Sequence, residues 1–105
     1  MKSIVLPCIA FLSLQPASAA TEEEYKTASM QLVIAASCRA TYGEDELFEV
    51  AFSRFEQVAR STEAPLRNSE IKETKQKMYE LDAMEGGNPF LKAFCEKLKE
   101  EFLPK

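Results

Sequence analysis

The sequence predicts an all-α protein, a small four-helix bundle held by one disulfide bond after an N-terminal signal peptide has been cleaved. Three observations predict this class. Apolar residues recur at three- and four-residue steps in four segments, glycine occurs only three times in 105 residues, and an apolar leader precedes an acidic chain whose full net charge is −4. Strand signals are almost absent.

Residues 1–19 have the anatomy of a secretory signal peptide. Lys2 provides a positive charge, an apolar run follows, and Ala17-Ser18-Ala19 offers the small residues at which signal peptidase cleaves. The run is too short for a membrane-spanning helix, which needs about 20 residues. We expect cleavage after Ala19, with cleavage after Ala20 as the alternative. Residues 20–105 are then a single periplasmic domain that does not insert into the membrane.

Two cysteines, Cys38 and Cys95, remain once Cys8 has left with the leader. An even number of cysteines in an exported chain favours pairing. The chain-entropy model assigns a bridge of this span about 4 kcal/mol, which is a large share of the stability of a small domain. We therefore predict a disulfide between Cys38 and Cys95 that joins the first helix to the last.

The first helix is expected from about residue 21 to residue 40. Thr21 and Glu24 form a capping box at its start, where acidic residues also complement the helix dipole. Residues 32–36 are apolar on every side, which is typical of a helix buried from several directions, so this should be the central helix of the bundle. Gly43 ends the unit.

The second and fourth helices carry wide apolar faces. The second opens with the acidic residues 44–46 and gives way to a loop at residues 61–65. The fourth begins at Asn88-Pro89, where an N-cap residue precedes a proline at the first helical position, and Pro104 ends it. Its apolar residues, at three- and four-residue steps, are Phe90, Leu91, Phe94, Cys95, Leu98 and Phe102.

The third helix, expected at residues 68–84, is the most polar of the four. Asn68 or Ser69 should cap its start, and Gly86 should end it in the left-handed conformation that glycine tolerates. Charged residues dominate its surface, so we expect it on the outside of the bundle. Its narrow apolar stripe consists of Ile71, Met78 and Leu81.

No catalytic residue, metal ligand or cofactor site is predicted. Without histidine, the chain cannot build Ser–His or Cys–His nucleophile pairs, and two cysteines are too few for the usual zinc site. No glycine-rich phosphate loop follows a strand. The acidic balance disfavours nucleic acid, which needs clustered basic charge. We therefore expect a protein that binds another protein rather than an enzyme.

Four aromatic residues are the candidates for contact with that partner. Tyr25, Phe48, Phe52 and Tyr79 can border a groove for an amphipathic partner helix, a recurring mode of recognition. The alternative is that the phenylalanines only fill the core of the bundle.

The order of these features resembles a known family. A leader, a helix ending in cysteine ("SMQLVIAASC"), an acidic turn opening a second helix ("GEDELFEVAF") and a final helix with the second cysteine ("FLKAFCEKLKEEF") resemble the pilotins of type II secretion, the PulS/OutS-like family, over most of residues 21–103. The resemblance implies that Cys38 and Cys95 are the family's disulfide and that the bundle grips a short helix at the C-terminal end of a secretin. It does not extend to a lipidated cysteine at the mature N-terminus.

Two other classes of exported protein also fit the sequence. One is an acid-stress periplasmic chaperone of the HdeA type, since 17 carboxylates would lose their charge in strong acid and leave the bundle cationic and self-repelling. The other is a periplasmic immunity protein, whose acidic surface would suit a basic toxin. The partner is accordingly a secretin tail, an unfolded client or a toxin. A monomer and a dimer are both compatible with the sequence.

Overall fold

The structure, a computed structural model, describes residues 19–104, and this part of the chain folds into four helices without a β-strand. The helices are α2 (Glu22–Tyr42), α3 (Asp45–Ser61), α4 (Asn68–Tyr79) and α5 (Pro89–Phe102). They confirm the predicted all-α bundle with one disulfide bond. The predicted signal peptide, apart from Ala19, lies outside the described residues. None of the four helices has the length and hydropathy needed to span a membrane.

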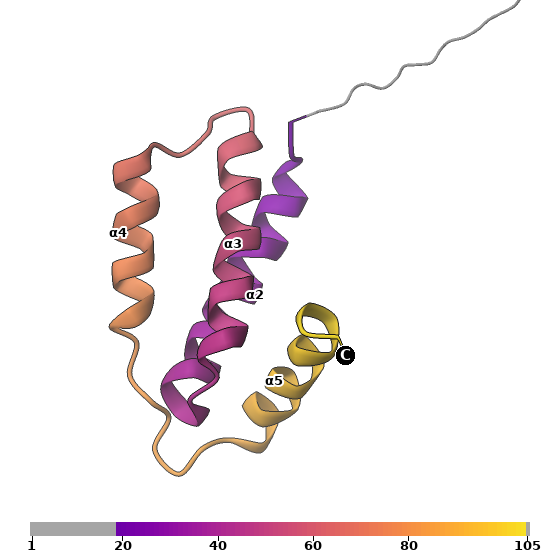
Figure 1. Cartoon of the computed structure of the whole chain (residues 1–105), viewed down its shortest axis with the longest axis vertical. Coiled ribbons are helices and arrows are strands. Elements are labelled where there is room, and N and C mark those ends of the chain that lie inside the picture. The colour runs from indigo at the N-terminus through magenta and orange to yellow at the C-terminus, as the bar shows by residue number, and fades with distance from the viewer. Residues whose placement is uncertain (1–18, 105) are drawn as a thin grey trace, which may run out of the picture.

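Helices α2 and α3 form a central antiparallel pair, with α4 on one flank and α5 on the other (Figure 1). α2 contacts each of the other three helices, as predicted for the central helix, and α3 does so too. Within residues 19–104, α4 and α5 make no contact with each other. The two outer helices therefore depend on the central pair alone for their positions.

The buried apolar side chains form two clusters, one on each flank of the central pair. The aromatic cluster, under α4, consists of Leu32, Ala36, Phe48, Phe52, Phe55, Ala59 and Ile71. The disulfide cluster, under α5, consists of Ala35, Cys38, Leu47, Ala51, Leu91, Cys95 and Leu98. No polar or charged side chain of the described residues is buried, so both clusters gain stability from the removal of apolar surface from water.

Local signals in the sequence set both ends of α2. The Thr21 hydroxyl accepts a hydrogen bond from the Glu24 backbone at 3.0 Å, and the Glu24 carboxylate accepts one from the Thr21 backbone at 2.8 Å. These bonds confirm the predicted capping box, and the bond from the Thr21 backbone lowers the pKa of Glu24. At the other end Gly43 has φ 73°, and its N–H donates to the Arg39 carbonyl at 2.9 Å. The glycine thereby ends the helix as predicted.

The start of α4 differs from the prediction at one residue. Its N-cap is Arg67, and Asn68 and Ser69, the two predicted caps, are already helical. The Glu70 carboxylate accepts the Arg67 backbone N–H at 2.8 Å, which satisfies one of the free donors at the helix start. Asn68 instead accepts a hydrogen bond from Arg60 of α3 at 2.6 Å. Its side chain joins two helices and is not available as a cap.

The end of α4 was predicted too far along the chain. The helix ends at Tyr79 rather than at residue 84, and Gly86 does not cap it. The cause is topological, because the chain must cross from the flank of α4 to the flank of α5 between the two helices (Figure 1). Both Gly86 and Gly87 have φ 74° and lie in this connection, so their left-handed conformation serves the crossing rather than a helix end.

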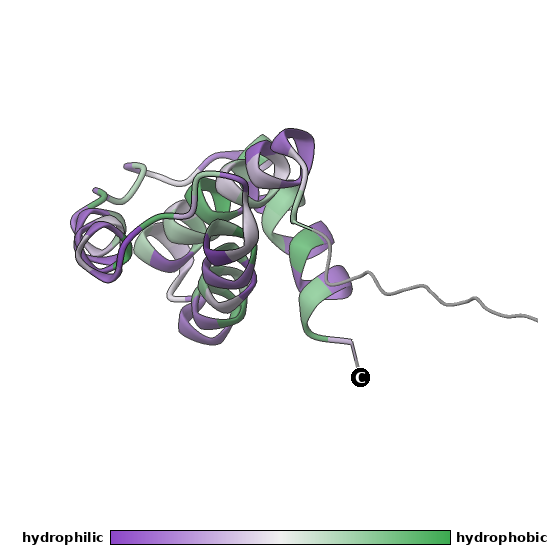
Figure 2. Ribbon diagram, turned by 90° about the horizontal axis from the view of Figure 1, so that it is seen from above, coloured by the Kyte–Doolittle hydropathy of each residue, from purple (hydrophilic) through white to green (hydrophobic). Residues whose placement is uncertain are grey.

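The two outer helices also differ in composition. Figure 2 shows that α4 is predominantly hydrophilic, whereas α5, next to the C-terminus, alternates hydrophobic and hydrophilic stretches. α5 begins as predicted, with Pro89 at its first position and the Asn88 side chain accepting hydrogen bonds from the backbone of Phe90 at 2.9 Å and of Leu91 at 3.1 Å.

Candidate protein-binding surface

The two phenylalanines predicted to border a groove lie in the core. Phe48 and Phe52 are buried members of the aromatic cluster, with their ring centroids 6.2 Å apart. Phe55 continues the series, 5.8 Å from Phe52. Their rings are covered by neighbouring helices in this conformation, which is the alternative placement that the sequence left open.

The two predicted tyrosines lie at the edges of the same cluster. Tyr79 of α4 packs on Phe48, with ring centroids 5.0 Å apart, and Tyr25 of α2 packs on Phe55 at 5.9 Å. The structure thus brings all four predicted residues into one continuous set of aromatic contacts, with Phe55 as the link to Tyr25. α4 covers Phe48 and Phe52 in this set, which its Tyr79 and Lys75 contact directly.

A polar network fastens α4 to α3 beside the aromatic cluster. The Tyr79 hydroxyl donates to Glu49 at 2.6 Å, and Lys75 Nζ donates to the other carboxylate oxygen of Glu49 at 3.3 Å. The Arg39 guanidinium of α2 lies 4.6 Å from the centre of the Tyr79 ring. The hydrogen bond from Tyr79, assisted by Lys75, lowers the pKa of Glu49, and the same bond raises the pKa of Tyr79.

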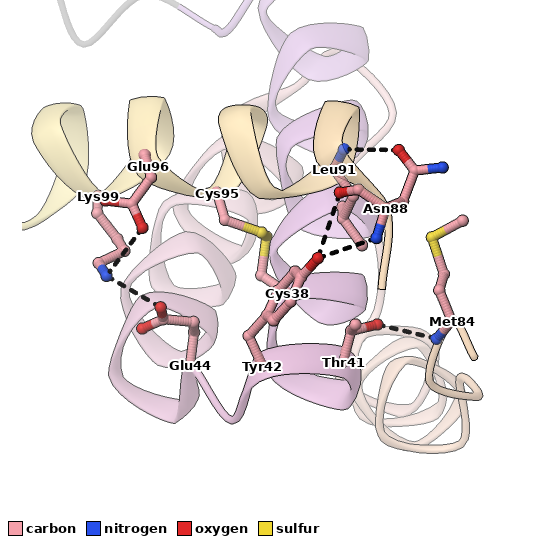
Figure 3. Close-up of a disulfide and its surroundings, with 10 residues drawn as sticks. All are labelled: Cys38, Thr41, Tyr42, Glu44, Met84, Asn88, Leu91, Cys95, Glu96 and Lys99. Atoms are coloured by element: carbon pink, nitrogen blue, oxygen red, sulfur yellow. Dashed lines mark hydrogen bonds and ion pairs between the residues drawn. A yellow bond between two sulfur atoms is a disulfide. The ribbon is translucent and has the colours of Figure 1, made fainter. Parts of the chain in front are cut away.

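The disulfide bond lies on the opposite flank (Figure 3). Cys38 of α2 and Cys95 of α5 are bonded, with a Cα–Cα distance of 5.8 Å, which confirms the predicted pairing. Both cysteines are almost completely shielded from solvent. Burial of the sulfur atoms keeps reductants from the bridge, and the bond fixes the middle of α5 against α2.

Two further contacts hold the ends of α5. Near its start, the Tyr42 hydroxyl donates to the Asn88 carbonyl at 3.2 Å and accepts from the Asn88 backbone N–H at 3.0 Å (Figure 3). Near its end, Lys99 donates to Glu44, the N-cap residue of α3, at 2.9 Å and pairs with Glu96 at 3.6 Å. The hydrogen bond to Glu44 raises the pKa of Lys99. α5 is therefore held at its start, its middle and its end.

Large apolar side chains remain exposed on and around this fixed helix. Phe90 is 76% exposed and Phe94 53%, although both were predicted as part of the apolar face of α5, of which Leu91, Cys95 and Leu98 are buried. Met30 of α2 is 64% exposed. We call this set the α2–α5 apolar surface; its members are Met30, Val33, Met84, Phe90 and Phe94.

Covalent and hydrogen-bond contacts place these side chains along α2 and α5. Phe94 precedes Cys95, which is bonded to Cys38 of α2. Met84 lies beside the C-terminal part of α2, since its backbone N–H donates to the Thr41 hydroxyl at 3.0 Å (Figure 3). Met30 and Val33 are exposed on α2, on either side of Gln31 and Leu32, where Gln31 donates to Glu101 of α5 at 3.4 Å. Together the five side chains offer two aromatic rings and two methionine side chains, which adapt readily to a partner's shape.

The spacing of apolar residues alone did not reveal this surface. Residues at steps of three and four along α5 were predicted to form one wide apolar stripe. The stripe is wider than the contact that α5 makes with α2 and α3. The signal that could have found the surface is the width itself, because Phe90 and Phe94 form a second line beside that of Leu91, Cys95 and Leu98.

A surface pocket of about 650 Å³ lies at the other end of α2, between its first turn and the loop after α3. Its lining includes Ala19, Ala20, Tyr25 and Leu66. The Ala20 backbone N–H donates to the Ser61 carbonyl at 2.8 Å and ties the start of the described chain to the end of α3. Among residues 19–104, no group of three or more potential ligands is placed to hold a metal ion.

Comparisons with protein families, with curated proteins and with solved structures find no match for this chain.

Proposed function

We propose that this chain is an exported, periplasmic adaptor that binds an amphipathic helix of a partner protein through the α2–α5 apolar surface. The observation that carries the proposal is the exposure of Phe90 and Phe94 on a helix that is held in three places. Since the disulfide bond fixes α5, these rings cannot turn inward to escape water. Neighbouring large apolar side chains that stay exposed, as Phe90 and Phe94 do, favour an interaction site.

A partner helix suits the shape of this surface. Phe90 and Phe94 are one helical turn apart on α5, and Met30 and Val33 are nearly one turn apart on α2. Side chains at this spacing form ridges that pack between the side chains of another helix. The resemblance to pilotins suggests which helix this is, a short segment from the C-terminal end of a secretin.

A titration with a synthetic peptide of such a secretin tail tests the proposal. We expect the oxidised chain to bind the peptide and the variants Phe90→Ser and Phe94→Ser each to bind at least about tenfold more weakly, since a buried aromatic anchor at an interface is often worth 2 kcal/mol or more. The matched control is Lys72→Ser, an exposed position on α4. Isothermal titration calorimetry provides the affinities. Binding that is equal in all four proteins contradicts this use of the surface, and no binding by the unmodified chain contradicts the secretin as partner.

Export is tested separately by the mass of the purified periplasmic protein. The proposal requires a chain that begins at Ala20 or Thr21 and carries one disulfide bond. A chain that retains its leader in the cytosol, or that has two free thiols, contradicts it.

An acid-stress chaperone is the second candidate, and three carboxylates favour it. Hydrogen bonds lower the pKa values of Glu24, Glu49 and Glu70, which act at the start of α2, at the contact between α3 and α4, and at the start of α4. Protonation of these groups in strong acid removes interactions that depend on the charged form. Near-UV circular dichroism at pH 2 decides this point: a native spectrum contradicts the chaperone function, and a reversible loss of signal with the bridge intact supports it.

A further inference from the structure

Helix α4 has little apolar attachment to the rest of the chain. Of its twelve residues, Ile71 alone is buried. Met78 and, just after the helix, Leu81 are partly buried against the aromatic cluster. α4 thus touches the central pair along one narrow stripe, and water reaches the rest of its surface.

The polar contacts of α4 are also at the surface. The Lys75–Glu49 pair has side chains that are 37% and 51% exposed, and Tyr79, which donates to the same carboxylate, is exposed as well. The Lys75 ammonium lies 5.0 Å from the centre of the Phe52 ring. Ion pairs and cation–π contacts that are open to solvent contribute little to stability, so these contacts orient α4 more than they hold it.

No covalent bond or neighbouring outer helix supports α4 among the described residues. The disulfide bond joins α2 to α5, and α4 does not contact α5. The connections on its two sides, residues 62–67 and 80–88, are not helical. A helix of this length is marginal by itself in water. Elements with few buried contacts and open polar contacts are the ones that detach by local opening.

Detachment of α4 would uncover aromatic rings that are buried in the closed protein. Phe48 and Phe52 lie under it, and Tyr79 and Lys75 of α4 contact them directly. With α4 removed, the face of α2 and α3 would present a row of aromatic rings beside the carboxylate of Glu49. That face already accepts an amphipathic helix, since α4 itself is one.

We propose that the face beneath α4 is a second helix-binding site, and that an amphipathic helix of a partner protein displaces α4 to occupy it. The contacts of α4 define the chemistry of the partner. Its helix carries apolar side chains seven residues apart, as at Ile71 and Met78, and between them a cation, as at Lys75, to pair with Glu49. This site lies on the flank opposite the α2–α5 apolar surface and does not depend on the function proposed for that surface.

A peptide with the sequence of residues 66–82 tests the proposal, because it has the chemistry required and competes with α4. The labelled peptide is titrated with the oxidised full chain, and fluorescence anisotropy reports binding. We expect the chain variant Ile71→Ala to bind the peptide about tenfold or more tightly than the unmodified chain, since weaker attachment of α4 raises the fraction of chains that are open. A peptide that itself carries Ile71→Ala should bind at least about tenfold more weakly than the unmodified peptide, because it lacks the one buried anchor.

Two further variants keep the result interpretable. If Ile71→Ala prevents folding, the milder Ile71→Val should still strengthen binding about twofold or more, since it removes one methyl group from the contact. The control Phe94→Ser, on the opposite flank, should leave the affinity unchanged. The proposal is overturned if no folded chain binds the peptide, if the Ile71 chain variants bind no more tightly than the unmodified chain, or if Phe94→Ser weakens binding.

Discussion

The two outer helices rest on the same central pair but are attached to it by different means. α5 is joined to α2 by a buried disulfide bond, buries Leu91, Cys95 and Leu98, and is tied at both ends by hydrogen bonds. α4 buries Ile71 alone and is otherwise held by contacts that water can reach. Composition explains the contrast, since α4 has a narrow apolar stripe and α5 has an apolar face wider than its contact.

The difference separates two ways of presenting apolar surface. α5 is fixed, and its surplus aromatic rings are permanently exposed beside α2. α4 is loosely attached, and the aromatic rings are hidden beneath it. A fixed surface is ready for a partner at once, whereas the covered face becomes available only when α4 detaches, which lowers the apparent affinity by the fraction of open chains.

The largest effect is expected from removal of the bridge. Replacement of both cysteines, Cys38→Ala with Cys95→Ala, should lower the free energy of unfolding by about 4 kcal/mol, because the bond limits the unfolded chain over a sequence separation of 57 residues. Urea denaturation measures the loss. A loss below about 1 kcal/mol would mean that apolar packing alone fixes α5.

Loss of the single buried side chain of α4 should cost less. Ile71→Ala is expected to lower the free energy of unfolding by about 2–3 kcal/mol, the lower part of the range for such changes. The loss is limited because α4 can detach while the other helices stay folded. Once it has detached, a weaker contact at residue 71 no longer affects their stability. Ile71→Val, with an expected loss of about 1 kcal/mol, is the matched control. If Ile71→Ala lowers the free energy of unfolding as much as removal of the disulfide bond does, the two outer helices are attached equally firmly.

Substitution of two neighbouring glycines tests the contact between Tyr42 and Asn88 at the start of α5. Gly86 and Gly87 both have φ 74°, so alanine at either position costs about 1–2 kcal/mol in left-handed strain. A Cβ at Gly87 would also lie 2.8 Å from the Tyr42 hydroxyl, which bonds Asn88, whereas a Cβ at Gly86 meets nothing within 4 Å. We expect Gly87→Ala to be the more destabilising of the two in urea denaturation. Equal losses would show that the Tyr42 contact adjusts freely.

The smallest effect concerns the carboxylate that orients α4. The pKa of Glu49 is lowered chiefly by the Tyr79 hydrogen bond, so its stabilising contribution is complete above the pKa of the unfolded chain and is lost as the pH falls through the lower folded pKa. Tyr79→Phe removes the donor and should raise the Glu49 midpoint in an NMR titration of the side-chain carboxyl. The loss of stability as the pH falls below the pKa of the unfolded chain should shrink in parallel. An unchanged midpoint contradicts the role given to this bond.

Elements with local signals were predicted well from the sequence. The capping box at Thr21, the left-handed Gly43 and the Asn88-Pro89 start each depend on contacts within a few residues. The bridge between Cys38 and Cys95, which the structure contains, was predicted from the number of cysteines and the expected export.

Other features that depend on distant segments were not predicted. α4 ends at Tyr79 because the chain must cross to the other flank, and no residue near Tyr79 encodes that crossing. The aromatic residues Phe48 and Phe52 could be groove or core until the position of α4 was known. The exposure of Phe90 and Phe94 depends in the same way on how much of α5 the central pair can cover.

Native-state hydrogen exchange in the oxidised chain is the most direct measurement of the difference between the two helices. The backbone amides of α4 should exchange through a local opening whose free energy is well below that of global unfolding and depends little on added denaturant. The amides of α5 around Cys95 should exchange only with global unfolding, together with those of α2 and α3. Exchange of α4 and α5 at the same free energy, or an opening of α5 that precedes that of α4, would contradict the account.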